Sequence, residues 1–214
     1  QTGFEKPLEI GTLSQLDQKK LQRTLIDLFI AGSLFYMGFY HLVLFFLRKK
    51  EKTTLFLGLF CFVMFIRTLI FGERLLYQVS QGSSIIPAFE IMNYLSFYLG
   101  IPLLVEFFYR LYPQEFKLIP VRVYQVIGLI AACTLFLQKT NVTFMVVQVY
   151  EILSLLIALY GLFVIILALK RKREDALLFF IGLGIFSLAG LNEALYNNGN
   201  INTFNTLGPG LFLF

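Results

Sequence analysis

The sequence contains few charged residues for its length. Of its 214 residues, 14% are Asp, Glu, Lys or Arg, 57% are hydrophobic, and the mean hydropathy is +0.74. A water-soluble domain usually carries about 25% charged residues. Because so little charge cannot cover a surface that faces water, the composition argues against an ordinary soluble domain and predicts an integral membrane protein.

Histidine and cysteine are also scarce. His41 is the single histidine, and the two cysteines, Cys61 and Cys133, have no Cys-x-x-Cys partner. A catalytic zinc site needs about three His, Cys or carboxylate ligands held together, so we expect neither a metal nor a cofactor. The cysteines are interpreted as buried thiols in helix packing. His41 is interpreted as a structural residue or a weak pH sensor.

The sequence also lacks the residues that an intramembrane aspartate protease or a retinal protein requires. An intramembrane aspartate protease needs two aspartates, and Asp27 is the only one within an apolar run. A retinal protein needs a lysine inside a late helix, and none of the complete apolar runs contains a lysine. We therefore expect this chain not to be an enzyme.

Long continuous apolar runs are the dominant feature of the chain. They lack the short alternating strands of an outer-membrane barrel, and each is near the ~20 residues with which a helix crosses the bilayer. Six complete runs occupy residues 25–47, 55–71, 87–108, 118–137, 142–169 and 176–195. A seventh opens around Leu207 and is cut off at Phe214. The predicted fold class is all-α, a polytopic membrane bundle of seven helices with the seventh truncated.

Basic residues gather in alternate loops and predict the orientation. After the first, third and fifth runs, in the loop or in the first turns of the next run, come Arg48, Lys49, Lys50, Lys52, Arg110, Lys117, Arg122, Lys170, Arg171, Lys172 and Arg173. The other loops hold only Arg74 and Lys139. Since cytoplasmic loops are enriched in Lys and Arg, we expect the N-terminus outside and the seventh helix ending in the cytoplasm. Topology thus accounts for the net charge of +5, and no nucleic-acid partner is implied.

The chain divides into two parts. Residues 1–24 are polar and are interpreted as an extracellular lead-in, the end of a missing ectodomain with a short linker helix. Residues 25–214 form the predicted seven-helix sensor domain. No internal repeat is seen, which argues against a transporter made of inverted halves.

Polar residues within the runs gather toward the extracellular side. With the orientation above, the outer halves hold Asp27, Arg67, Glu90, Asn93, Gln148, Glu151, Asn192 and Glu193. One interpretation is an outward-opening polar cavity that binds a small ligand or receives a loop of an extracellular domain. The other is that Arg67 pairs with one acid, such as Glu90, and locks the second run to the third, since buried charges in membranes are usually paired.

Proline and glycine mark two candidate hinges. Pro102 lies in the middle of the third run and is expected to kink it. Gly208, Pro209 and Gly210 lie where the seventh helix begins. We interpret the second set either as a flexible joint that moves the seventh helix or as an ordinary proline kink.

Dispersed motifs give the chain a resemblance to a known family. They lie in four segments. The first is residues 32–47, which include the run Met37 to His41, and the second is Arg67 with residues 71–73. The third is residues 90–113, which include Pro102, continued to residue 115, and the last is residues 192–196 with 201–203 and Gly208. In these segments the chain resembles the bacterial seven-transmembrane receptors with diverse intracellular signalling modules, over roughly residues 25 to 214.

This resemblance implies that sensing and output are carried out by separate domains on the two sides of the membrane. An extracellular domain would precede the helices, and a cytoplasmic nucleotide or diguanylate cyclase, histidine kinase or phosphatase would follow the seventh. The expected partners are the lipid bilayer, these two domains, an unknown small ligand and a second copy in a homodimer. The expected location is the bacterial inner membrane. The alternative function is a small-solute or cation transporter with an acidic site in its outer half.

Overall fold

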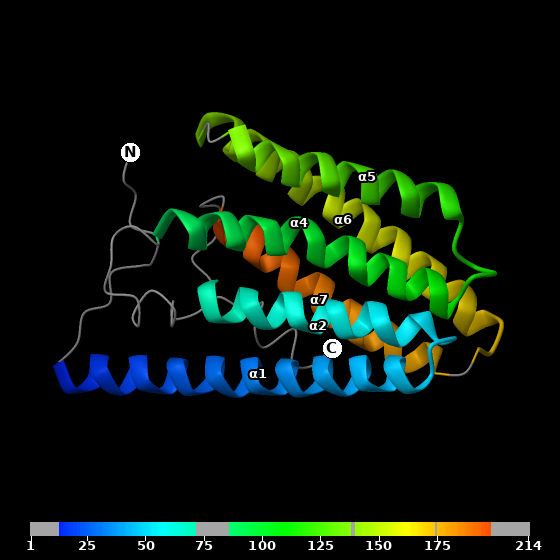
Figure 1. Cartoon of the computed structure of the whole chain (residues 1–214), viewed down its shortest axis with the longest axis horizontal. Helices are drawn as coiled ribbons and strands as arrows, with labels where there is room; N and C mark the ends of the chain where they lie inside the picture. The colour runs from blue at the N-terminus through cyan, green and yellow to red at the C-terminus, as the bar shows by residue number, and fades with distance from the viewer. Residues whose placement is uncertain (1–12, 72–85, 138–139, 174, 198–214) are drawn as a thin grey trace.

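The computed structural model is a bundle of long α-helices (Figure 1). It describes residues 13–71, 86–137, 140–173 and 175–197, and this part of the chain contains no strand. The helices are α1 (Leu13–Leu47), α2 (Lys52–Phe71), α4 (Ile86–Leu111), α5 (Leu118–Thr134), α6 (Thr140–Lys170) and α7 (Ala176–Asn197), with a 3-10 turn η1 (Leu135–Leu137) after α5. The prediction of an all-α membrane bundle is confirmed.

The helices lie side by side along one axis, and α4 is central among them (Figure 1). α1 packs on α2, α2 packs on α4, and α4 also contacts α5 and α6. α7 packs on α6, and its aromatic rings reach two more helices: Phe186 meets Phe60 of α2, and Phe179 meets Phe107 of α4. Every described helix is therefore joined to α4 directly or through one neighbour.

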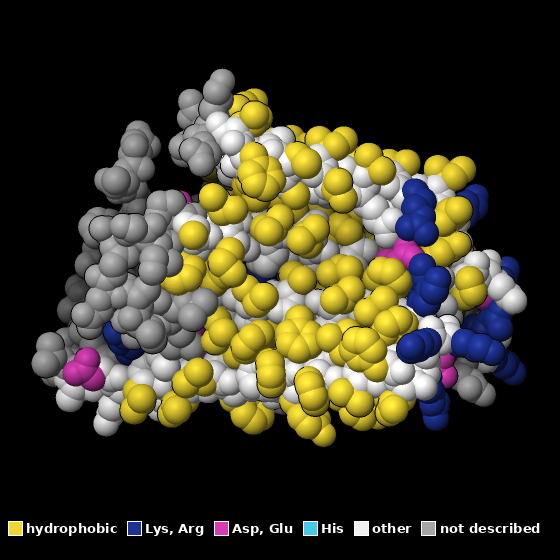
Figure 2. Space-filling view, viewed as in Figure 1, with side chains coloured by type: hydrophobic (Ala, Val, Ile, Leu, Met, Phe, Trp, Pro, Cys, Tyr) yellow, Lys and Arg dark blue, Asp and Glu magenta, His cyan; other side chains and the backbone are white. Residues whose placement is uncertain are grey.

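The side chains divide into a packed interior and an apolar exterior. Tyr98, Tyr150 and Phe60 are almost fully buried, whereas large apolar residues such as Phe46 and Ile119 are mostly exposed. Figure 2 shows hydrophobic side chains over much of the face in view. A water-soluble protein rarely exposes apolar patches of this extent, and five helices are long and apolar enough to cross a membrane. The chain is a multi-pass membrane protein.

Lysine and arginine side chains gather at one end of the bundle, where α1, α4 and α6 end (Figure 2). This end brings together the basic loops that the sequence places after the first, third and fifth runs. We refer to it below as the basic end.

The observed bounds follow the predicted runs with three differences. α1 begins at Leu13, so the expected linker helix and the first run form one continuous helix. The run 118–137 ends as a 3-10 turn. The apolar stretch of α7, Ala176–Asn192, is shorter than the five candidate spans. The predicted seventh helix, with Gly208, Pro209 and Gly210, lies outside the described residues.

Candidate functional site

Arg67 is buried in α2 and is held by Asn93 of α4. Its Nη1 donates to the Asn93 carbonyl oxygen at 3.2 Å and to Asn93 Oδ1 at 3.1 Å. Its guanidinium also lies over the Phe97 ring, 5.4 Å from the centroid. A charge in the membrane interior requires such partners. The side chain is 8% exposed, so this contact ties α2 to α4 within the bundle.

The other predicted residues of the outer half occupy different environments. Glu90 on α4 and Gln148 on α6 are exposed, so the α4 residue that binds Arg67 is the amide Asn93 and not the acid Glu90. Three more are half-buried and each has an interaction partner: Asp27 on α1, Glu151 on α6 and Asn192 on α7. Glu193 belongs to α7, but its side chain lies outside the described residues.

Pro102 leaves a gap in the hydrogen bonding of α4, and a neighbouring helix fills it. Proline has no N–H, so the carbonyl four residues earlier, that of Tyr98, loses its donor within the helix. The hydroxyl of Tyr150 on α6 donates to this carbonyl oxygen at 3.0 Å. A buried carbonyl left without a donor costs about 1–3 kcal/mol in proteins, and hydrocarbon has no water that could replace the donor. The bond between α4 and α6 is therefore structurally required by the proline.

A third helix meets the same point through Gly128 of α5. A Cβ added there would lie 2.9 Å from Pro102 Cγ, 3.0 Å from the Tyr98 carbonyl oxygen and 3.2 Å from Tyr150 Oη. Glycine is needed because any side chain would collide with this crossing. α4, α5 and α6 thus approach one another closely around the proline.

A short chain of hydroxyl groups continues from this crossing. Ser154 Oγ donates to the Tyr150 carbonyl at 2.6 Å, and Tyr124 Oη lies 2.7 Å from Ser154 Oγ. Because a serine hydroxyl has one hydrogen, Tyr124 must be the donor in the second bond. The hydroxyl of Tyr98 is buried without a hydrogen-bond partner among the described residues. Tyrosine and serine therefore link α5 to α6 beside the proline.

Glu106 forms the centre of a charged cluster near the basic end. It is 1% exposed on α4. Its Oε1 lies 2.7 Å from Arg110 Nη2, and its Oε2 lies 3.3 Å from Arg122 Nη1 and accepts from Gln125 Nε2 at 2.8 Å. The Arg110 guanidinium also lies 4.7 Å from the centroid of the Phe56 ring on α2. The cluster joins α4, α5 and α2.

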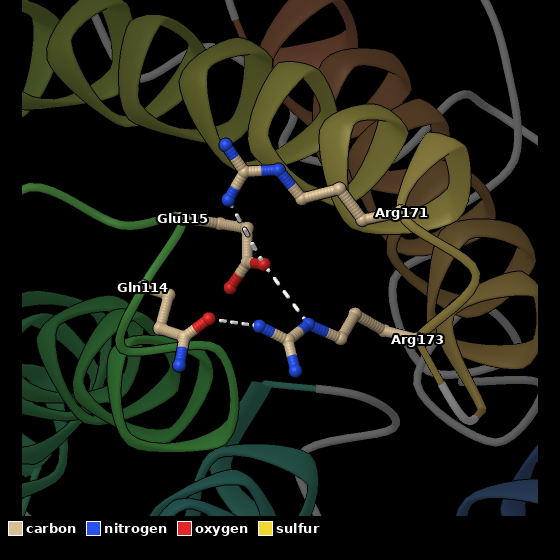
Figure 3. A network of polar contacts seen from close by, with 4 residues as sticks. All are labelled: Gln114, Glu115, Arg171 and Arg173. Atoms are coloured by element: carbon tan, nitrogen blue, oxygen red, sulfur yellow. Dashed lines mark hydrogen bonds and ion pairs between the residues drawn. The ribbon is translucent and has the colours of Figure 1, made fainter.

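Glu115, in the loop after α4, clamps that loop to the end of α6 (Figure 3). Its side chain is 1% exposed and lies 3.4 Å from Arg171 Nη1 and 3.1 Å from Arg173 Nε. Arg173 also donates to the Gln114 side chain. The clamp places the loop between α4 and α5 against the turn between α6 and α7.

Tyr112 lies beside this clamp, just after α4 ends. Its buried ring packs edge-on against Phe179 of α7. Burial raises the pKa of the Tyr112 phenol, and the charges of Asp175 and Glu115 raise it further. The phenol therefore loses its proton at a higher pH than an exposed tyrosine does.

The sequence interpretation missed the tyrosine crossing and the two charged clusters. It could have found the first, because Pro102 requires an outside donor for the carbonyl of Tyr98. It could also have paired Glu106 with Arg110, since residues four apart share a helix face. No group of three His, Cys, Asp or Glu that could hold a metal occurs within the part of the chain that the structure describes.

Comparisons with known proteins give one match. A family model described as 7TM diverse intracellular signalling matches residues 23–214. No curated protein and no solved structure matches the chain. The match covers all the described helices except the first residues of α1, so the chain belongs to the 7TM diverse intracellular signalling family and is a transmembrane domain of signalling-receptor type.

Proposed function

We propose that the chain senses a signal outside the cytoplasm and relays it across the bacterial inner membrane to a cytoplasmic output domain. The observation that carries the proposal is the series of contacts along α4. Arg67 of α2 binds Asn93 of α4 in the outer half. Tyr150 of α6 binds the Tyr98 carbonyl of α4 beside Pro102. Near the basic end, Arg122 and Gln125 of α5 bind Glu106 of α4. A helix held at three levels by different neighbours can carry a displacement from one side of the membrane to the other.

The input side has two candidate elements. Residues 1–24 would connect an extracellular domain to the first span, and from Leu13 on they are already part of α1. This helix has 35 residues, which corresponds to about 50 Å at 1.5 Å per residue. The polar residues of the outer half, from Asp27 to Glu193, would bind a small ligand or a loop of that domain. Either event would act on Arg67 and Asn93, which join α2 to α4.

The output side would act through the seventh helix. With the N-terminus outside, that helix delivers the chain to the cytoplasm, where the family implies a nucleotide or diguanylate cyclase, a histidine kinase or a phosphatase. Gly208, Pro209 and Gly210 would form the joint at its start. Since such outputs work in pairs, we propose that the receptor is a homodimer.

A reversible bridge between α2 and α4 tests the relay. In the full-length receptor, Cys61 and Cys133 are first replaced by alanine, and Arg67→Cys and Asn93→Cys are then introduced together. A short bifunctional methanethiosulfonate reagent bridges the two thiols, and the basal rate of the output domain is measured in vesicles. We expect the bridge to change this rate severalfold and a reductant to restore it.

The two single-cysteine variants, treated with the same reagent, serve as controls for labelling. An output rate that the bridge leaves unchanged would contradict a relay through α4. The transporter alternative predicts a different result: cation or solute uptake into the vesicles that Glu90→Gln and Glu151→Gln abolish, whether or not an output domain is present.

A further inference from the structure

Arginine outnumbers acid in the cluster around Glu106. Two arginines, Arg110 and Arg122, face the single carboxylate of Glu106. The other buried acid near this end, Glu115, is occupied by Arg171 and Arg173. Within the described residues the Glu106 cluster therefore keeps one positive charge beyond what its own acid neutralises.

The arginines retain unused hydrogen-bonding capacity. Nε of Arg110 is buried and has no hydrogen-bond partner among the described residues. Arg122 is half exposed, with 51% of its side chain accessible, and among the described residues its one bond beyond Glu106 goes to Gln125. A guanidinium has five N–H donors. Through the exposed side of Arg122, the cluster can therefore accept an outside anion without giving up Glu106.

The start of α5 adds to the attraction for an anion. α5 begins after Lys117, which makes no side-chain capping bond to it. The N-terminus of a helix carries a partial positive charge and favours anions. Arg122 lies in the second turn of this helix. The partial positive charge of the helix N-terminus and the charge of the Arg122 side chain therefore attract an anion to the same region.

The surroundings of Arg122 are apolar and face outward. Residues three or four positions apart share one face of a helix, and on α5 this face holds Ile119, Arg122, Val126 and Ile130. The three apolar members are 76%, 57% and 60% exposed. In Figure 2 the apolar surface continues up to the charged side chains of the basic end. An anion at Arg122 would thus lie directly above a surface suited to acyl chains.

We propose that Arg110 and Arg122 form a binding site for the phosphate of an anionic phospholipid, with the acyl chains along Val126 and Ile130 on the outward face of α5. Basic pockets between transmembrane helices on the cytoplasmic side bind such headgroups. One phosphodiester charge balances the one excess positive charge of the cluster. The site connects the lipid composition of the membrane to α4, the helix on which the proposed relay depends.

The test measures lipid association with the full-length protein. The protein is reconstituted in phosphatidylcholine vesicles, and the association of spin-labelled phosphatidylglycerol is compared with that of spin-labelled phosphatidylcholine. Each basic residue near the surface contributes about 1 kcal/mol, so we expect Arg122→Gln to lower the preference for phosphatidylglycerol about fivefold. Arg110→Gln with Arg122→Gln should abolish it.

The control variant is Lys49→Gln with Lys172→Gln, which removes two exposed charges from the same end. It should keep most of the preference, and an equal loss in control and double variant would overturn the site. Glu106→Gln should strengthen the association, because it removes the competing carboxylate, and a weaker association would also overturn the proposal. Excess inorganic phosphate should leave the preference intact; displacement by it would identify a free-phosphate site instead.

Discussion

The hydroxyl of Tyr150 donates to the carbonyl oxygen of Tyr98 across 3.0 Å, at the one place where Pro102 removes the donor that α4 would otherwise supply. Pro102, which lacks the donor, is on α4, whereas Tyr150, which supplies one, is on α6. The hydrogen bond that α4 lacks is thereby replaced by a specific contact with α6, and Gly128 lets α5 join the same crossing.

The first prediction concerns this repair. Tyr150→Phe leaves the Tyr98 carbonyl buried and unsatisfied, which costs about 1–3 kcal/mol, so we expect a lower midpoint of thermal unfolding in detergent. Pro102→Ala restores an N–H at position 102, and the double variant should therefore lose less stability than Tyr150→Phe alone. A double-mutant cycle gives the coupling between the two sites. Additive losses would mean that the two residues act independently.

The second prediction concerns Gly128. Gly128→Ala places a methyl group 2.9 Å from Pro102 Cγ and 3.0 Å from the Tyr98 carbonyl oxygen. Overpacking of this kind costs about 1–3 kcal/mol. Gly184→Ala is the matched control, because nothing lies within 4 Å of a Cβ added on that helical glycine. Thermal unfolding should show a loss for the first variant and none for the second; equal midpoints would contradict the close approach of α4 and α5.

Most of the helices could be predicted because a segment that crosses hydrocarbon must meet two simple requirements. A span must be apolar and helical to satisfy its own backbone, so the predicted runs and the helices agree within a few residues at most ends. The start of α1 is the exception. Residues 13–24 are polar, and composition does not reveal that the helix continues through them without a break.

The polar contacts were harder to predict because they depend on which faces meet. The basic loops predict that Arg67 and Glu90 lie in the outer half. They do not predict that the faces of α2 and α4 present Asn93 to the guanidinium and leave Glu90 exposed. The same holds for Glu115 and Arg173, which are far apart in the chain and meet because α4 and α6 end together. Such pairs follow from helix packing and not from spacing along the sequence.

The third prediction concerns Arg67 and its amide partner. Asn93→Leu removes the Oδ1 acceptor of a buried guanidinium, and hydrogen bonds to charged groups contribute about 1.5–3 kcal/mol. We expect a corresponding loss of thermal stability. Asn93→Asp keeps an acceptor and adds a carboxylate, so it should preserve or raise the midpoint. Gln148→Leu replaces an exposed amide and serves as the control. A loss as large in the control would show that the effect is not specific to Arg67.

The last prediction concerns Tyr112 and alkaline solution. The pKa of its phenol is raised in the folded protein by burial and by the charges of Asp175 and Glu115, whereas in the unfolded chain it is about 10. Between these two values the folded state binds more protons, so its stability must fall as pH rises above about 10. Below that pH the contribution is fully present. Tyr112→Phe removes the ionisable group and should flatten this part of the curve, as measured by unfolding midpoints of both proteins at pH values on either side of 10. The difference between the two proteins isolates Tyr112 from the lysines that titrate in the same range. Parallel curves would show that the phenol ionises alike in the folded and unfolded states, which its burial against Phe179 argues against.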